Sequence, residues 1–494
     1  MTDQLSEPVS DLGMGTVARR SMWLSVGSLV GSALAVLTSF VLARWLGPSR
    51  FGRVQGVLLV YFYVALVRTG AFESALRRYI RLRALGRDDE ARRARDVGTT
   101  VDFVFSLVPA LGLVVWGLAS DGGLWQRGLL LAPLVVMTTT AGAYLGELRA
   151  ADHRFDLVAV SGVVRSLSYA ALALGGVALF GDTALFVAPA LADLLAVAVL
   201  ASQRPRIGLR PRFDLPVAKD LVRSGLALGA LPAVYWMYRL AGSTSVALGT
   251  DVVTFGLFSF AAAPVAVLLR AISQVDAVLT PAIWGEIARD EGDRRWLPAA
   301  DRVTTTLFVV AGFATNLSQA GFGPVVLRFL PDYADAVPLF EVLAFNVVLL
   351  SVGVVPSLVL RDEEHGSQNR YLLLWVGALV VNVAANAVAL AAGFGATTVA
   401  WNDVWVQAVV VIALFAMAAQ RLDVPGWGRR AAIGFPVAAA TVATVFGLRL
   451  LDGLAVRCVL VLGVWVSILF LVRHRLRPSE EMGRSTHVGA VVAD

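Results

Sequence analysis

Apolar runs of about twenty residues follow one another along the whole chain, separated by short polar gaps. An apolar run of roughly 18 or more residues can satisfy its own backbone hydrogen bonds as a helix and match a hydrocarbon layer about 30 Å thick. The pattern therefore predicts an all-α polytopic membrane protein with about fourteen transmembrane helices. The predicted spans are residues 21–46, 54–74, 97–119, 128–147, 157–180, 183–202, 224–246, 252–284, 303–322, 337–360, 371–392, 396–420, 431–448 and 453–472.

The basic residues gather in every second gap between these spans. Most of the 42 Lys and Arg residues lie there, and the other gaps hold only Arg50, Arg53, Arg127, Arg328 and Arg449. Short loops rich in Lys and Arg stay in the cytoplasm. The alternation therefore predicts that both termini are cytoplasmic and that the gaps poor in arginine face outward.

Composition agrees with a single integral membrane protein. The chain has 494 residues, 57% of them hydrophobic, and a mean hydropathy of +0.72. Its net charge of +6 would also suit nucleic-acid binding, but the excess is spread over short loops and forms no basic domain, so we expect no nucleic-acid partner. The N-terminal tail lacks the basic start of a signal peptide. We expect a multi-pass protein of a prokaryotic inner (plasma) membrane.

The sequence contains no motif for catalysis or cofactor binding. It has no GxxxxGK[ST] phosphate loop and no HExxH metal motif, and Cys458 is its only cysteine. The acidic groups at 88–90, 290–293 and 362–364 lie in predicted inner loops, where solvated charge is the simpler interpretation. We therefore predict a protein that is not an enzyme, with no catalytic residue, no metal and no cofactor.

Two long basic gaps organise the chain. We expect residues 75–96 to form a basic helix at the membrane surface and residues 203–223 to be a cytoplasmic linker. The linker would separate a first six-helix bundle, 21–202, from a second, 224–420. Six is an even number, so the two bundles would be parallel repeats about an axis along the membrane normal. Residues 421–472 would add a helix pair, and 1–20 and 473–494 would be cytoplasmic tails.

A short sequence echo favours this repeat. The chain contains LGPSRFG at Leu46–Gly52 and LGTDVVTFG at Leu248–Gly256. Each copy places a Leu-Gly and a Phe-Gly at a predicted outer turn, one after the first span and one after the seventh.

Three segments resemble a known family. LARWLGPSRFGRVQGVL (42–58), FLPDYADAVPLFEVL (329–343) and VVNVAANAVAL (380–390) are similar to the polysaccharide exporter and lipid-linked oligosaccharide flippase branch of the multidrug/oligosaccharidyl-lipid/polysaccharide exporter superfamily. The resemblance implies a transporter that flips undecaprenyl-diphosphate-linked oligosaccharides from the inner to the outer leaflet for cell-surface polysaccharide biosynthesis. It also implies membrane lipids as partners, with a polysaccharide polymerase or glycosyltransferase as a further candidate partner. Where many relatives carry an Asp in the seventh helix, this chain has Tyr235, Trp236, Tyr238 and Arg239.

Ionisable side chains within the spans are the candidate site residues, because each costs about 2.5 kcal/mol or more near the membrane centre. Arg165 and Arg270 lie deepest, and a guanidinium suits bidentate binding of a diphosphate. Arg239 and Arg68 lie nearer the span ends, where each could extend its charge to the headgroup layer instead. These four are the predicted substrate-binding residues.

The acids Asp193 and Asp276 are candidates for ion pairs with arginines of other helices, or for coupling to a proton. Asn382 and Asn386 are one turn apart, which favours interhelical hydrogen bonds. Span 252–284 is too long for a straight bilayer crossing, and Pro264 and Pro281 are places where it could bend or end.

Three other functions remain open from the sequence alone. A drug or cation antiporter of the same superfamily would need a cavity dominated by acids. A peptidoglycan-precursor flippase would also suit fourteen spans. A membrane glycosyltransferase or polymerase would need a large outer loop, which the short outer gaps do not offer.

Overall fold

In the computed structural model, the described residues are 14–120, 122–152, 154–202, 210–289, 297–361, 368–422, 434–451 and 453–476, and they contain helices but no strands. The first half holds α1 (Met14–Leu66), α2 (Ala71–Ala84), α3 (Asp88–Leu118), α4 (Gly123–Ala151), α5 (Phe155–Phe180), the short 3-10 helix η2 (Gly181–Thr183) and α6 (Ala184–Ser202). The second half holds α7 (Leu215–Gly249), α8 (Val252–Arg289), α9 (Leu297–Phe329), η3 (Pro331–Tyr333), α10 (Ala336–Leu343), α11 (Phe345–Arg361), α12 (Gln368–Ala391) and α13 (Ala396–Leu422). The last pair is α15 (Gly434–Arg449) and α16 (Leu454–Leu476).

The predicted spans correspond to these helices. α1 contains the first predicted span and most of the second, joined at Gly47, whose φ of 67° interrupts the helix. α10 and α11 together cover the predicted span 337–360. By length and apolar composition alone, eight helical stretches among the described residues could cross a membrane, and two of these, Val30–Leu66 and Phe155–Ser202, each hold two predicted spans.

Two details differ from the sequence-based prediction. The second span does not continue to residue 74, because α1 ends at Leu66 and residues 67–70 break the helix before α2. Gly70 adopts a φ of 74°, which favours glycine, and a carboxylate on α3 holds the freed backbone amides, as described below. Pro264 and Pro281 do not end the eighth span, since α8 is one helix from Val252 to Arg289.

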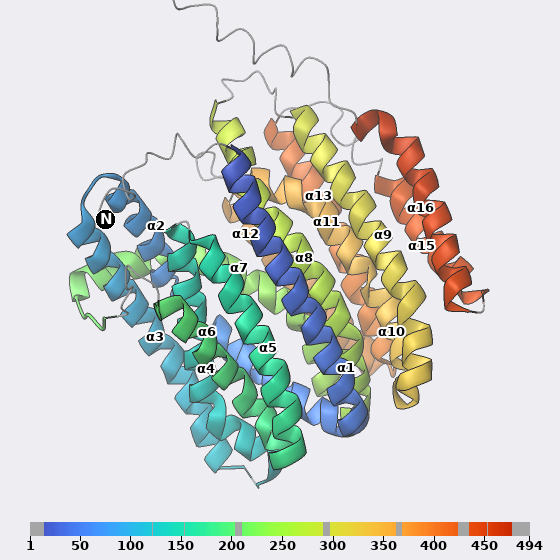
Figure 1. The fold of residues 1–494 in the computed structure, drawn as a ribbon, viewed down its shortest axis with the longest axis horizontal. Coiled ribbons are helices and arrows are strands. Elements are labelled where there is room, and N and C mark those ends of the chain that lie inside the picture. Colours follow the sequence, from blue (N-terminus) through green and yellow to red (C-terminus); the bar gives the residue numbers. More distant parts are fainter. Residues whose placement is uncertain are drawn as a thin grey trace, which may run out of the picture.

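The helices form two bundles and an added pair. In Figure 1, α3 to α6 lie on one side of α1, and α9, α10, α11 and α13 lie on the other, with α15 and α16 at the far edge beside α9. α5 and α6 pack on each other and α4 packs on α6, whereas α12 packs on α7 and α13, and α11 on α9 and α13. The bundles meet where α1 packs on α8 and where α2 packs on α7. This is the predicted arrangement of two parallel bundles with an extra helix pair.

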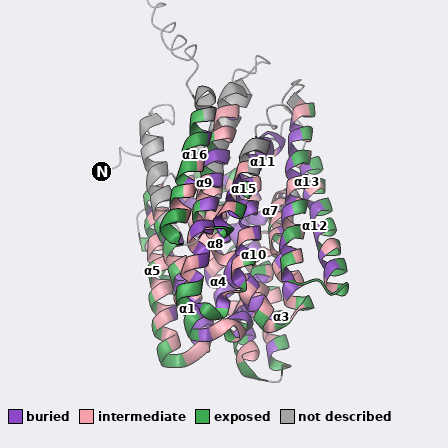
Figure 2. Cartoon of the chain, turned by 90° about the vertical axis from the view of Figure 1, so that its right-hand side faces the viewer, coloured by how far each residue is buried: buried purple, intermediate pink, exposed green. Residues whose placement is uncertain are grey.

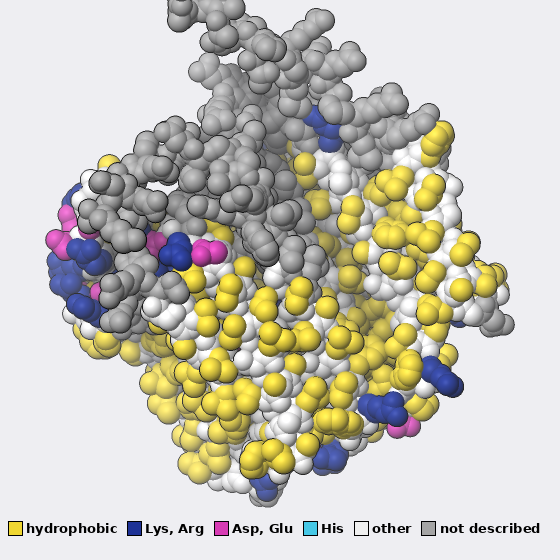
Figure 3. Space-filling model, viewed as in Figure 1, with side chains coloured by type: hydrophobic (Ala, Val, Ile, Leu, Met, Phe, Trp, Pro, Cys, Tyr) yellow, Lys and Arg dark blue, Asp and Glu magenta, His cyan; other side chains and the backbone are white. Residues whose placement is uncertain are grey.

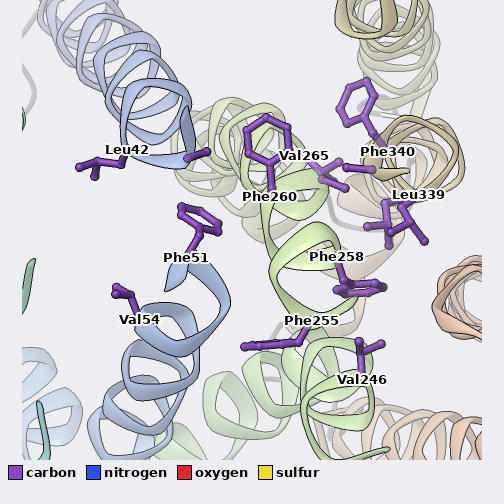
Figure 4. Close-up of a cluster of buried hydrophobic side chains, with 14 of the residues drawn as sticks. Leu42, Phe51, Val54, Val246, Phe255, Phe258, Phe260, Val265, Leu339 and Phe340 are labelled. Atoms are coloured by element: carbon purple, nitrogen blue, oxygen red, sulfur yellow. The ribbon is translucent and has the colours of Figure 1, made fainter. Parts of the chain in front are cut away.

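Aromatic side chains fill the contact between α1 and α8. The rings of Phe51 and Phe260 are 6.4 Å apart between centroids, and Phe260 lies 4.5 Å from the ring of Tyr333. Figure 4 shows Phe255 extending from α8 towards α1, with Phe51 on the facing helix. Burial of this apolar surface holds the two bundles together at this end.

The outer surface of the helices is apolar. Figure 2 shows exposed and half-buried residues along the lengths of α1, α12 and α16, and Figure 3 shows hydrophobic side chains across the visible face, with charged ones gathered near its edges. Large hydrophobic side chains are exposed all along the helices, among them Leu37, Val108, Val115, Leu179 and Val388. An apolar belt of this extent indicates a lipid-facing surface.

At one end of the interface, two glycines allow the backbones of the two bundles to come into direct contact. A Cβ on Gly52 would lie 2.2 Å from the carbonyl oxygen of Val252, and a Cβ on Gly256 would lie 2.1 Å from that of Pro48. Gly52 and Gly256 are the last residues of the two echoed segments, and Pro48 and Val252 each precede their glycine by four positions. The contact is therefore reciprocal, as a two-fold axis between the bundles requires.

A second close contact joins the bundles at the end that carries α2 and the start of α3, which we call the basic end because the arginine-rich gap 75–96 lies there. A Cβ on Gly70 would lie 2.0 Å from the carbonyl oxygen of Gly225. The hydroxyls of Ser74 and Ser224 are 2.7 Å apart. The two bundles thus touch through glycine backbone at both ends of their interface.

Candidate functional site

An arginine of the first bundle faces the second bundle from a charged cluster. Nε of Arg165, on α5, donates to a carboxylate oxygen of Asp193 on α6, and the hydroxyl of Thr139 on α4 donates to the other oxygen. The Asp193 side chain is only 4% exposed, whereas that of Arg165 is 46% exposed. Asp193 therefore fixes one edge of the guanidinium and leaves the rest accessible.

Arg165 lines a cavity of about 290 Å³ between the two bundles. Its walls come from α1 and α4 to α6 of the first bundle and from α7 and α8 of the second. Ser243 and Ser259 are its polar residues on the second bundle.

Arg270, the other deep arginine, lies on α8 across the interface. Arg270 is exposed, and it does not line the cavity that holds Arg165, although other residues of α8 do. Two like charges on facing elements repel each other, and a bound anion between them would relieve that repulsion. The structure therefore places two of the four predicted substrate-binding arginines on the two sides of the bundle interface.

Arg239 and Arg68 are placed elsewhere. Arg239, on α7, interacts electrostatically with Asp403 of α13. Arg68 lies in the break after α1, where its guanidinium sits 5.4 Å from the ring centre of Tyr144 and 3.9 Å from Oε1 of Glu73. Neither residue lines the cavity that holds Arg165. Asp276 is on α8, but its side chain falls outside the described residues.

Asp403 belongs to a chain of amide hydrogen bonds within the second bundle. Nδ2 of Asn382 donates to Oδ1 of Asp403 over 2.8 Å, and Nδ2 of Asn386 donates to Oδ1 of Asn382 over 3.1 Å. Asn402 donates in turn to Asn386 over 3.0 Å. The two asparagines predicted to share a face thus bond to each other and bridge α12 to α13. Asp403 was not among the predicted site residues, although it is an acid inside an apolar span, the same signal that marks Asp193.

Asp102, on α3, is a second buried acid that the sequence analysis missed. It is fully buried and accepts from the backbone N–H groups of Thr69 and Phe72, each over 3.1 Å. The hydroxyls of Thr69 and Tyr144 also donate to it. The carboxylate therefore satisfies the backbone that the break at 67–70 exposes, which is a structural role.

Outside the membrane-spanning segments, one acid joins the linker to the first bundle. Asp214 accepts from the guanidinium of Arg93, and its Oδ1 accepts from the backbone N–H of Val217 over 3.3 Å, which caps the start of α7. The hydrogen bonds from Arg93 hold the pKa of Asp214 below its usual range. This contact ties α7 to α3 at the basic end.

A second cavity, of about 410 Å³, lies within the second bundle. Its walls come from α7, α8, α11, α12 and α13, and Arg77 of α2 contributes from the first bundle. The polar and aromatic residues that line it are Arg77, Tyr235, Ser357, Arg361, Gln368, Tyr371, Trp375 and Gln407. The sequence analysis selected none of these as a site residue. No group of three or more His, Cys, Asp or Glu residues that could hold a metal ion occurs within the part of the chain that the structure describes.

Two bundles that meet around a cavity, in an apolar all-α shell, form a multi-pass membrane protein, and solved transporters of the multidrug/oligosaccharidyl-lipid/polysaccharide exporter (MOP) superfamily share this fold. The lipid II flippase MurJ in an inward closed conformation is similar over 92% of this chain and 100% of its own, with a TM-score of 0.69 and 11% identity.

Other solved structures share the fold at lower scores. An inward-facing multidrug resistance MATE family transporter of the MOP superfamily is similar over 82% of this chain and 94% of its own (TM-score 0.54, 15% identity). A MOP superfamily transporter from Pyrococcus furiosus, described by a reverse polarity of its binding pocket, is similar over 83% and 97% (TM-score 0.52, 15% identity). No family model and no curated protein matches the sequence. Because these identities are low, the likeness shows the fold alone and says nothing about the substrate.

Proposed function

We propose that this protein flips a polyprenyl-diphosphate-linked oligosaccharide from the inner to the outer leaflet by alternating access. The observation that carries the proposal is Arg165, whose guanidinium is 46% exposed in a cavity between the two bundles, with Arg270 on α8, one of the helices that line this cavity. A diphosphate is the kind of ligand that two guanidiniums bind well, through bidentate, charge-assisted hydrogen bonds. Asp193 would act as the ion-pair partner that orients Arg165, and Asp276 stays a candidate for ion coupling.

The glycine contacts support alternating access. Gly52 and Gly256 at one end, and Gly70 and Gly225 at the other, bring the backbones of the two bundles together at two separate places of the interface. Such contacts can separate at one end while the other stays closed. We propose that the basic end faces the cytoplasm of a prokaryotic cell, with both termini inside, and that the linker 203–223, whose residues 215–223 already form the start of α7, separates the bundles 21–202 and 224–420. The cavity would then open in turn to each side.

The membrane potential would favour this direction of transport. Moving a negative charge out of a cell that is negative inside gains roughly 2.3 kcal/mol per charge per 100 mV. Two net charges on the diphosphate would therefore gain about 4 to 5 kcal/mol at 100 mV. Export would need no other energy source if no counter-ion crosses with the lipid.

The test is to delete the gene in its host and assay lipid-linked sugars by leaflet. We expect them to accumulate in the inner leaflet and to return to the outer leaflet with the wild-type gene. Arg165→Ala and Arg270→Ala should each fail to restore export while reaching the membrane at normal levels. Arg328→Ala, which removes an exposed arginine at the end of α9, is the matched control and should restore it.

The rival functions give other results. Unchanged lipids with a new sensitivity to cationic dyes would favour a drug or cation antiporter. Accumulation of the peptidoglycan precursor alone would favour a flippase for that lipid. Full export by both arginine variants would remove the proposed binding site.

A further inference from the structure

The cavity within the second bundle contains buried polar groups that lack partners. Gln407 of α13 is fully buried, and neither its amide nitrogen nor its amide oxygen has a hydrogen-bond partner among the described residues. Trp375 of α12 is 2% exposed, and its indole N–H likewise has none there. Both residues line the cavity. Proteins rarely leave buried polar groups unsatisfied, so these groups indicate a ligand that supplies the missing bonds.

Aromatic rings surround the same space. The ring of Tyr235 lies edge-on to Trp375 with 5.0 Å between centroids, and the ring of Tyr371 lies 6.2 Å from it. Tyr235, on α7, is half-buried, while Tyr371 and Trp375 are buried. Aromatic walls with a few polar groups are typical of small-molecule sites, and about 410 Å³ lies within their usual range of roughly 300–1,000 Å³.

The cavity lies next to the proposed diphosphate site. Leu269 and Ile272 of α8 line it, and Arg270 lies between them in the sequence. Arg77 and Arg361 line it as well. Trp375 lies about 10 Å along α12 from its start at Gln368, near the basic end, and Gln407 lies about 17 Å along α13 from the opposite end. The cavity therefore runs from near the basic end towards the middle of the bundle.

We propose that this cavity is the subsite for the first sugar of the lipid-linked oligosaccharide. This inference rests on the proposed function. A pyranose ring has hydroxyl groups at its edge that both donate and accept, and apolar C–H groups on its face. The hydroxyls would bond the Gln407 amide and the Trp375 N–H, and the C–H face would pack on the aromatic rings. A polyprenyl chain would leave the amide and the indole N–H unsatisfied, so the sugar fits better than the lipid tail.

Gln319 provides a matched control, because it is a buried amide of the same bundle whose partners are present. Its Nε2 donates to the backbone carbonyl of Glu341 over 2.7 Å, and its Oε1 accepts from Asn316 over 3.0 Å. It does not line the cavity. Gln407→Leu and Gln319→Leu therefore make the same chemical change at an unsatisfied and a satisfied position.

The experiment measures dissociation constants of the full-length protein in lipid nanodiscs. The probes are undecaprenyl diphosphate without sugar and undecaprenyl diphosphate that carries glucose, galactose or N-acetylglucosamine. We expect the wild type to bind at least one sugar-bearing lipid about tenfold more tightly than the sugar-free lipid, the effect of two net hydrogen bonds. Gln407→Leu should reduce this difference to about threefold, the part that the Trp375 N–H supplies, and leave binding of the sugar-free lipid unchanged. Trp375→Phe, which keeps a ring and removes the N–H, should reduce the difference about threefold.

Several results would overturn the proposal. If the wild type binds all three sugar-bearing lipids no more tightly than the sugar-free lipid, the cavity holds water only. If Gln407→Leu weakens binding of both kinds of lipid equally, or if Gln319→Leu reduces the difference as much as Gln407→Leu does, the amide acts through the fold. Loss of the diphosphate function itself would look different, because the wild type would then bind none of the four lipids.

Discussion

Asp102 in the first bundle and Gln407 in the second are both fully buried polar side chains within predicted membrane spans. Asp102 accepts hydrogen bonds from two backbone amides and two hydroxyls. Gln407 has no partner for either end of its amide within the described residues. A carboxylate costs more free energy to bury than a neutral amide. Of these two residues, the carboxylate of Asp102 is thus the one whose hydrogen-bond partners are present.

The difference distinguishes buried polar side chains that stabilise the fold from buried polar side chains that are available to bind a ligand. A carboxylate can be buried only where several donors compensate its lost hydration, and Asp102 does this by fixing the break that precedes α2. A neutral amide costs less, so a cavity can keep it unsatisfied until a ligand binds. Substitutions at these positions should therefore change different properties, stability at Asp102 and binding at Gln407.

The largest effect is expected from Asp102→Leu. The substitution leaves the N–H groups of Thr69 and Phe72 buried without an acceptor, and each such group costs about 1–3 kcal/mol. We expect a loss of about 3 kcal/mol or more, seen as a lower melting temperature in detergent and less protein in the membrane. The control is Asp156→Asn, whose exposed pair with Arg154 should matter little. A normal melting temperature for Asp102→Leu would remove the structural role of this acid.

A smaller effect is expected from Asp193→Leu. The variant removes the carboxylate that Arg165 and Thr139 share, but Arg165 is 46% exposed and water in the cavity can solvate it. We expect a loss of about 1–2 kcal/mol in thermal unfolding, smaller than at Asp102. Removing the arginine as well, in Asp193→Leu with Arg165→Met, should recover part of this loss. No recovery would show that the two side chains contribute independently.

Most of the fold could be predicted from sequence, because the membrane imposes a long apolar run on every span and a charge bias on the loops. The predicted spans all correspond to helices, and the echo at Leu46–Gly52 and Leu248–Gly256 marks the reciprocal contact between the bundles. The break at 67–70 could not be predicted. It depends on hydrogen bonds to Asp102, more than thirty positions further along the chain.

The candidate site was predictable only in part. Arg165 and Arg270 stand out because each is a charge within an apolar run. Asp102 and Asp403 carry the same signal and could have been selected by it. The cavity around Gln407 gives no such signal, since a glutamine in a span is ordinary and its unsatisfied amide depends on five helices packed around it.

The pair of Arg93 and Asp214 extends the comparison to a more accessible site, where we expect only a small effect. Arg93 lowers the pKa of Asp214 in the folded protein, so this acid stabilises the fold above its unfolded pKa of about 3.9. That contribution is lost as the pH falls through the lower, folded pKa. Asp214→Asn should therefore lower the melting temperature slightly at pH 7, and its difference from the wild type should shrink below about pH 4. A difference that is the same at both pH values would show that the cap of α7, not the charge, provides the stability.

The smallest change in stability is expected from Gln407→Leu, and its sign is the sharpest test of the comparison. Leucine fills a similar volume and removes a buried amide that has no partner, so the melting temperature in detergent should stay equal or rise slightly. Gln319→Leu makes the same exchange where both ends of the amide are bonded, and it should lose about 1–3 kcal/mol because the Glu341 carbonyl and the Asn316 amide lose their partner. If both variants lost stability equally, Gln407 would have partners in the folded protein without ligand. Its amide would then hold the bundle together, as Asp102 does in the other.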